Sequence, residues 1–137
     1  MNYWLIALTR EDMEHCIRVG TFGVNRKNTI GNVQKGDKVA CYITKESKII
    51  ALGEATSSYY MDDKNIFKTQ GSFPDRFDFK APPLGRENEI DFKAMVDDFQ
   101  FITNKFYWTV YLRNGIAKIS GDDWQLINRK TKQHTHA

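Results

Sequence analysis

The sequence predicts an α+β fold, in which helices flank a barrel-like β-sheet within one domain. A β-hairpin over residues 35–60 is the first observation behind this prediction, because a short charged connection there joins two β-rich runs. The run 38–44 also carries apolar side chains on both faces, which is typical of a central strand in a closed or two-layered sheet. Helix starts at Thr9 and Ser120, near the two ends of the chain, supply the helical part.

Composition narrows the class of protein. The chain has 137 residues, 41% of them hydrophobic and 27% charged, which suits a single soluble domain with one substantial core. No apolar run approaches the roughly 18 residues needed to cross a bilayer, and residues 1–4 lack a secretory signal pattern. We therefore expect a cytoplasmic protein with no membrane partner. Cys16 and Cys41 stand at apolar positions without metal-binding spacing, so we expect buried, reduced thiols.

The first part of the chain reads as strand, helix and a short extended piece. Residues 3–8 form a strand that is apolar on both faces. Thr9 is the expected N-cap of the helix that follows, and Gly20 ends that helix. Residues 21–24 are then extended, and a turn of helix over 29–33 leads into the hairpin.

The second run of the hairpin carries small residues on one face, at Ala51, Gly53 and Ala55. A row of small side chains indicates that something lies close against the sheet. A helix, another stretch of backbone and a flat ligand all fit this pattern, and a packed helix is the ordinary explanation.

The C-terminal half continues with clear and unclear segments. Residues 76–80 alternate, which places Phe77 and Phe79 toward the core and the charged residues toward water. A helix capped by Asp91 is expected from the apolar spacing of the residues after it. The segment 106–112 fits either a strand or a turn of helix. The last expected elements are a strand at 116–119 and the helix after Ser120. We therefore expect the domain to span residues 1–128, followed by a polar, frayed tail over 129–137.

Known catalytic patterns are missing from the sequence. It contains no glycine-rich phosphate loop, no HExxH, no paired-cysteine zinc spacing and no Gly-x-Ser-x-Gly elbow. His15 lies on the polar side of the first helix. The aspartates that are adjacent in sequence, at 62–63, 97–98 and 122–123, have diverging side chains and do not form an acid/base couple. We therefore expect no catalytic residue, no metal and no cofactor, and a protein that is not an enzyme.

Several aromatic residues fall outside any core periodicity. They are Phe22, Tyr59, Tyr60, Phe67 and Phe73. Each of them alone fits a loop anchored into the core, but loop aromatics at a sheet end also form stacking pockets for nucleobases. Basic residues are frequent between 26 and 48, which points to an anionic partner for this part of the surface, but a solvated face explains this charge as well and charge alone does not decide between the two.

A series of short segments, in order and spacing, resembles the EVE domain family of the PUA-like superfamily, which is related to YTH domains. The segments are Tyr3-Trp4, Gly20-Thr21-Phe22-Gly23-Val24, Lys27-Asn28-Thr29, Lys35-Gly36-Asp37-Lys38, Ile50-Ala51-Leu52-Gly53-Glu54-Ala55, Phe101-Ile102-Thr103-Asn104-Lys105 with Trp108, and Ile119-Ser120-Gly121-Asp122-Asp123-Trp124. The resemblance runs from Tyr3 to about Ile127. It implies a small PUA-like mixed β-barrel of about five to six strands with flanking helices.

The resemblance also implies a function. It implies a non-enzymatic module that holds a flipped, modified base of DNA or RNA in an aromatic pocket, and we expect such a module to be a monomer. With the loop aromatics and the basic stretch, the residues we expect in the base pocket are Phe22, Phe67, Phe73, Tyr59, Thr9 and Asn28, and those we expect to contact phosphates are Arg10, Arg26, Lys27 and Lys38. The alternatives are a protein- or peptide-interaction module that uses the same aromatic surface, and an enzyme that acts on a small molecule.

Overall fold

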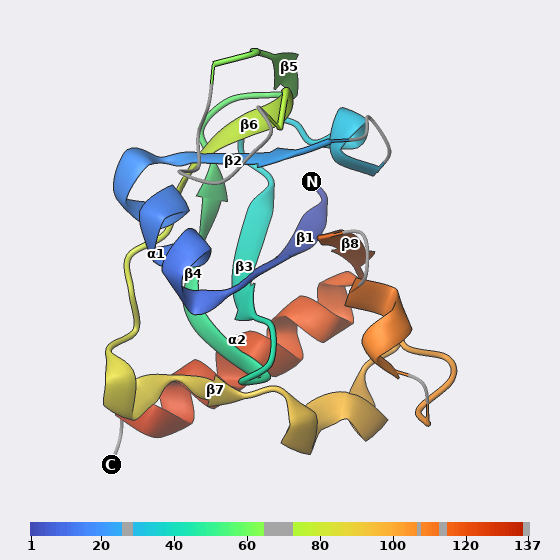
Figure 1. Ribbon diagram of the computed structural model, residues 1–137. Coiled ribbons are helices and arrows are strands. Elements are labelled where there is room, and N and C mark those ends of the chain that lie inside the picture. Colours follow the sequence, from blue (N-terminus) through green and yellow to red (C-terminus); the bar gives the residue numbers. More distant parts are fainter. Residues whose placement is uncertain (26–28, 65–72, 107, 113–114, 136–137) are drawn as a thin grey trace.

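The computed structural model describes residues 1–25, 29–64, 73–106, 108–112 and 115–135 (Figure 1). The principal strands are β1 (Tyr3–Leu8), β2 (Thr21–Val24), β3 (Lys38–Ile43), β4 (Lys48–Ala55), β6 (Asp75–Lys80) and β8 (Ile116–Ile119), with the two-residue strands β5 (Tyr60–Met61) and β7 (Ile90–Asp91). The helices are α1 (Arg10–Val19), α2 (Gly121–Thr135) and the 3-10 helices η1 (Thr29–Asn32), η2 (Arg86–Asn88), η3 (Lys93–Asp98) and η4 (Trp108–Leu112).

The strands form one curled, mixed sheet. Its order is β2-β6-β4-β3-β1-β8, with β5 added beside β6 and β7 beside β4. β1 and β3 run parallel, and the other pairs are antiparallel. The predicted hairpin is confirmed, since β3 and β4 pair from Lys38 opposite Glu54 to Ile43 opposite Lys48.

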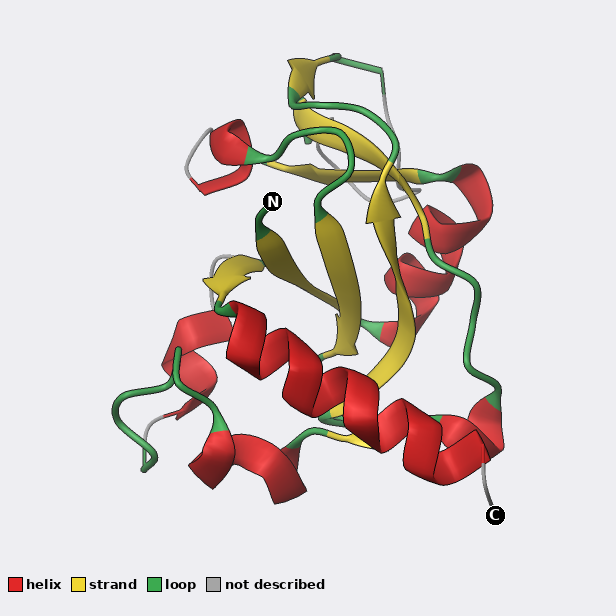
Figure 2. Cartoon of the chain, turned by 180° about the vertical axis from the view of Figure 1, so that it is seen from behind, coloured by secondary structure: helices red, strands yellow, loops and turns green. Residues whose placement is uncertain are grey.

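Two apolar cores lie on the two faces of the central strands. One face of β1 and β3 packs into what we call the interior core, which includes Trp4, Phe22, Phe77 and Phe79 and is covered by α1. The other face packs against α2 and η3 in a second core (Figure 2). This arrangement explains why residues 3–8 and 38–43 are apolar on both faces, because neither face of these strands meets water.

The ends of α1 form as predicted. The Thr9 side chain accepts a hydrogen bond from the backbone N–H of Asp12 at 3.4 Å, and Gly20 ends the helix in the left-handed region at φ 77°.

None of the helices in the described ranges combines the length and the apolar character that a membrane-spanning helix requires.

The small-residue face of β4 lies against another stretch of backbone. A Cβ atom placed on Gly53 would stand 1.9 Å from the carbonyl oxygen of Lys80 and 2.6 Å from the Cα atom of Ala81. Of the three explanations considered for this face, close backbone approach is therefore the one that holds at Gly53. The contact brings the end of β6 directly over β4.

Several elements differ from the sequence expectation. The segment after Asp91 is the 3-10 helix η3, and Asp91 belongs to β7, so it is not an N-cap. The segment 106–112 contains the 3-10 helix η4. α2 continues to Thr135, beyond the boundary expected at residue 128, because no glycine or proline interrupts it. The side chain of Arg76, expected to face water, is buried with 4% of its surface exposed.

Candidate functional site

Three hydrophobic residues and one carboxylate form an edge of the interior core. Val24, Tyr59 and Phe73 are half-buried and pack against this core, and Asp75 is buried with 5% of its surface exposed. We call these four residues the core rim. They come from the end of β2, the approach to β5 and the start of β6, so the sheet topology gathers them.

Strand alternation explains why Asp75 reaches this edge. Side chains two residues apart in a strand point to the same face, so Asp75 lies on the same face of β6 as Phe77 and Phe79. Opposite them on β2, Phe22 pairs with Phe77, and Val24 pairs with Asp75. The ring centroids of Phe22 and Phe77 are 5.7 Å apart. A carboxylate therefore ends a row of packed aromatic rings.

Phe73 has an unusual backbone conformation for a bulky residue. Its φ is 50°, in the left-handed region, which costs about 1–2 kcal/mol for a residue with a Cβ atom. The buried Arg76 donates from Nε to the Phe73 carbonyl oxygen at 3.0 Å, and its Nη1 lies 3.7 Å from Asp62 Oδ2. Arg76 thus helps to hold the strained residue at the rim.

Tyr59 is fixed at both its backbone and its side chain. Its backbone N–H donates to the carbonyl oxygen of Val33 at 3.1 Å, and its hydroxyl donates to Asp75 Oδ1 at 2.6 Å. The hydrogen bond to this carboxylate raises the pKa of Tyr59 to about 12. Tyr59 therefore stays a neutral donor at physiological pH and orients the Asp75 carboxylate.

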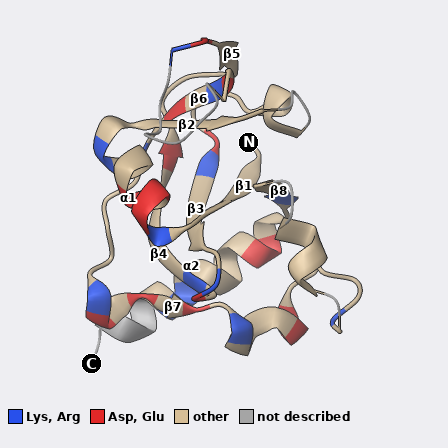
Figure 3. Ribbon diagram, viewed as in Figure 1, with Lys and Arg blue, Asp and Glu red and all other residues tan. Residues whose placement is uncertain are grey.

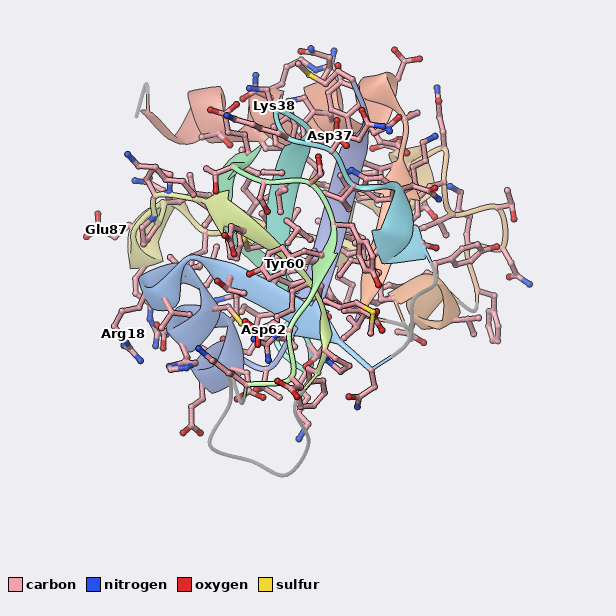
Figure 4. All side chains as sticks on the ribbon, turned by 90° about the horizontal axis from the view of Figure 1, so that it is seen from above. Arg18, Asp37, Lys38, Tyr60, Asp62 and Glu87 are labelled. Carbon is pink, nitrogen blue, oxygen red and sulfur yellow. The ribbon has the colours of Figure 1, made fainter. Side chains whose placement is uncertain are left out.

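Tyr60 makes a matching pair on the other face of β6. Its hydroxyl donates to Asp78 Oδ1 at 2.6 Å, and Thr21 Oγ1 donates to the same oxygen at 2.9 Å. Desolvation and the bond to Asp78 raise the pKa of Tyr60 to about 12. Figure 4 shows Tyr60 in the middle of this end of the molecule, with Lys38 toward one edge and Asp62 toward the other.

The two raised tyrosine pKa values predict an alkaline effect. Because both phenols hold their protons more tightly in the folded protein than at the ordinary value of 10.0, their contribution to stability is complete below pH 10 and is lost as the pH rises through about 12. In an ultraviolet titration, we expect the phenolates of Tyr59 and Tyr60 to appear late, together with that of Tyr42, whose pKa is raised by burial, and one fewer late phenolate in Tyr59→Phe. Ionisation of all tyrosines near pH 10 with the fold intact would contradict these pairings.

Phe22, Thr9 and Lys38, which the sequence predicted as site residues, lie in three different environments. The Phe22 ring has no exposed surface, and the Thr9 side chain caps α1. Lys38 Nζ lies 3.9 Å from a carboxylate oxygen of the exposed Glu54. Four further predicted residues, Arg26, Lys27, Asn28 and Phe67, lie outside the described part of the chain.

Arg10 is occupied by carboxylates. It donates two hydrogen bonds to Glu46, at 2.9 and 2.7 Å, and two to Glu89, at 2.9 and 2.8 Å. These bonds raise the pKa of Arg10 and lower the pKa of both glutamates. The guanidinium therefore ties α1 to the β3–β4 connection and to the segment before β7, and its charge is neutralised there.

Sequence reasoning missed Asp75 and Arg76 as site residues. The signal for Asp75 was present, because extending the alternation of Phe77 and Phe79 by one step places it on the core side. Arg76 offered no such signal, since its partners Phe73 and Asp62 lie in connections. Figure 3 shows acidic and basic segments interspersed over the elements, so charge alone does not mark the rim.

Comparison with known proteins places the chain in a family. The profile of the EVE domain matches residues 2–130. The UPF0310 protein PH1033 of Pyrococcus horikoshii is 31% identical over 145 residues, which cover 94% of this chain and 98% of that protein.

Solved structures with little sequence similarity share the fold. Human THYN1, determined in complex with DNA containing 5-methylcytosine, has a TM-score of 0.63 at 12% identity and covers 98% of both chains. The Mmi1 YTH domain has a TM-score of 0.65 at 8% identity, covering 98% of this chain and 77% of the other. The predicted PUA-like mixed barrel with flanking helices is confirmed, and the chain belongs to the EVE domain family.

Proposed function

We propose that this protein is a non-catalytic nucleic-acid-binding module whose core rim receives one unpaired or extruded base. Phe73 carries the proposal, because a half-exposed aromatic residue is held in a strained conformation at the rim by the buried Arg76. Strain of this kind is concentrated at ligand-binding sites. The fold shared with human THYN1, which was solved with methylated DNA, supports the same function.

The chemistry of the rim suits a base. Tyr59 and Phe73 offer aromatic surface for stacking, which contributes about 1–3 kcal/mol per base. The Phe22 and Phe77 rings lie behind the rim in the interior core, where neither has exposed surface. Extrusion from a duplex costs a few kcal/mol, so single strands should bind more tightly than sound duplex.

Cations near the rim supply the phosphate contacts in this proposal. The backbone N–H of Lys35 donates to Ser58 Oγ at 3.2 Å, which brings the 35–38 turn beside the segment that leads to Tyr59. Lys38 is the first residue of β3, directly after this turn. We propose that Lys35 and Lys38, together with Arg26 and Lys27, contact the phosphates. Each phosphate contact to a single strand should add about 0.7 to the slope of log affinity against log salt.

The test is an anisotropy titration with single-stranded DNA and RNA, with and without 5-methylcytosine or N6-methyladenine, at two salt concentrations. We expect Phe73→Ala and Phe73→Gly to weaken binding by about 5- to 150-fold, because both remove the stacking ring. Glycine tolerates a φ of 50°, so Phe73→Gly should be about 1 kcal/mol more stable than Phe73→Ala.

Phe106→Ala is the matched control, since Phe106 is 82% exposed and lies in the connection between η3 and η4. It should leave binding unchanged. Wild-type affinity of Phe73→Gly at both salt concentrations would overturn the proposal. Weak salt dependence with no response to base modification would instead favour a peptide as the ligand.

A further inference from the structure

Asp75 is a nearly sealed carboxylate of which one oxygen is used. Oδ1 accepts the hydroxyl of Tyr59, and within the described residues Oδ2 accepts no hydrogen bond. No side-chain nitrogen or oxygen that is sealed from solvent in the described part of the chain lacks a partner. Oδ2 therefore keeps contact with solvent, although the residue as a whole is only 5% exposed.

Anchoring β5 to β6 does not by itself explain this arrangement. The pair of Tyr60 and Asp78 makes a bond of the same length, 2.6 Å, on the opposite face of β6. Asp78 is half-buried there, away from the aromatic row. Asp75 stands at the end of that row and pairs with Val24, so its carboxylate lies among the apolar residues of the rim.

We propose that Asp75 Oδ2 accepts a hydrogen bond from the N4 amino group of a bound cytosine or the N6 amino group of a bound adenine, so that the rim prefers cytosine to uracil and thymine. This inference rests on the proposed function. Cytosine and adenine present N4–H and N6–H donors, whereas uracil and thymine present a carbonyl oxygen at the position of cytosine N4. A carbonyl oxygen facing the carboxylate would leave two acceptors opposed and unpaired.

Methylation of the base separates this contact from stacking. 5-Methylcytosine and N6-methyladenine each keep an N–H donor, so the rim accepts them. N4,N4-dimethylcytosine and N6,N6-dimethyladenine keep the aromatic ring but have no N–H at the amino group. The Tyr59 hydroxyl donates to Oδ1 of Asp75, which leaves Oδ2 as the oxygen that can accept from the base.

The first experiment changes the ligand and leaves the protein intact. Wild-type protein is titrated with oligonucleotides that carry one central cytosine, uracil, 5-methylcytosine or N4,N4-dimethylcytosine in an otherwise identical single strand. We expect the uracil and dimethylcytosine strands to bind about ten- to hundredfold more weakly than the cytosine strand.

The second experiment changes the acceptor. In Asp75→Asn the amide oxygen still accepts the Tyr59 hydroxyl, which turns the NH₂ group into the place of Oδ2. The preference for cytosine over uracil should then disappear or reverse. Asp78→Asn alters the twin pair on the other face, so it should keep the wild-type preference, and thermal melting of both variants checks that they fold.

The outcomes separate the two levels of the proposal. Absence of binding to every single strand would overturn the proposed function. Binding with equal affinity for the cytosine, uracil and dimethylcytosine strands would overturn only the role of Asp75. An unchanged cytosine preference in a folded Asp75→Asn variant would do the same.

Discussion

We expect Phe22→Ala to lower the free energy of unfolding by about 3–5 kcal/mol, because truncating a fully buried phenylalanine removes its apolar contacts and leaves a cavity. Phe22 has no exposed surface and packs tilted against Phe77 at 5.7 Å. The cost is a large share of the stability of a domain of this size. Urea denaturation followed by circular dichroism measures it, and any loss of binding by this variant will be largely a loss of folded protein.

Phe73→Ala is the control for Phe22→Ala, since it removes the same atoms at the rim rather than in the core. We expect it to cost clearly less stability, because Phe73 is only half-buried. A change below about 1 kcal/mol in Phe22→Ala would mean that the ring does not occupy the interior core. Phe22 would then be available as a stacking surface.

Gly53→Ala should destabilise the fold by about 3 kcal/mol, through overpacking rather than through a cavity. The added methyl group would stand 1.9 Å from the carbonyl oxygen of Lys80 and 2.6 Å from the Cα atom of Ala81. Both neighbours are backbone atoms, so β6 must move away from β4 to admit the methyl group. Thermal melting measures the loss.

Gly121→Ala is the matched control for Gly53→Ala. A Cβ atom at Gly121 would meet the Tyr3 ring at 3.5 Å, an ordinary contact, at the first residue of α2. We expect a change within about 0.5 kcal/mol there. A similarly small effect at Gly53 would show that β4 and β6 do not approach as closely as described.

Much of the fold was predictable because its signals are local. The hairpin, the Thr9 cap and the Gly20 stop each depend on residues a few positions apart. The apolar character of both faces of β1 and β3 correctly indicated their central position in the sheet. Glycine at position 53 indicated that another group lies close to β4, but the sequence did not identify that group.

The candidate site was less predictable, because its residues are defined by partners distant in sequence. The ion pairs of Arg10 reach Glu46 and Glu89, and no local pattern indicates that they neutralise it. The depth of Phe22 depends on its cross-strand partner Phe77. Aromatic type alone could not distinguish a core ring from one at the rim.

The pairing of β1 with β8 has a consequence for synthesis and for engineering. Tyr3 lies opposite Ile119, so β1 gains its neighbour on this edge only after β8 has been synthesised. A nascent chain that stops before Ile116 lacks both β8 and α2, and it exposes the edge of β1 together with the second core. Contacts this distant in sequence slow folding. A fragment that carries the rim but lacks β8 and α2 would leave the second core uncovered, so the sheet is complete only once both elements have been synthesised.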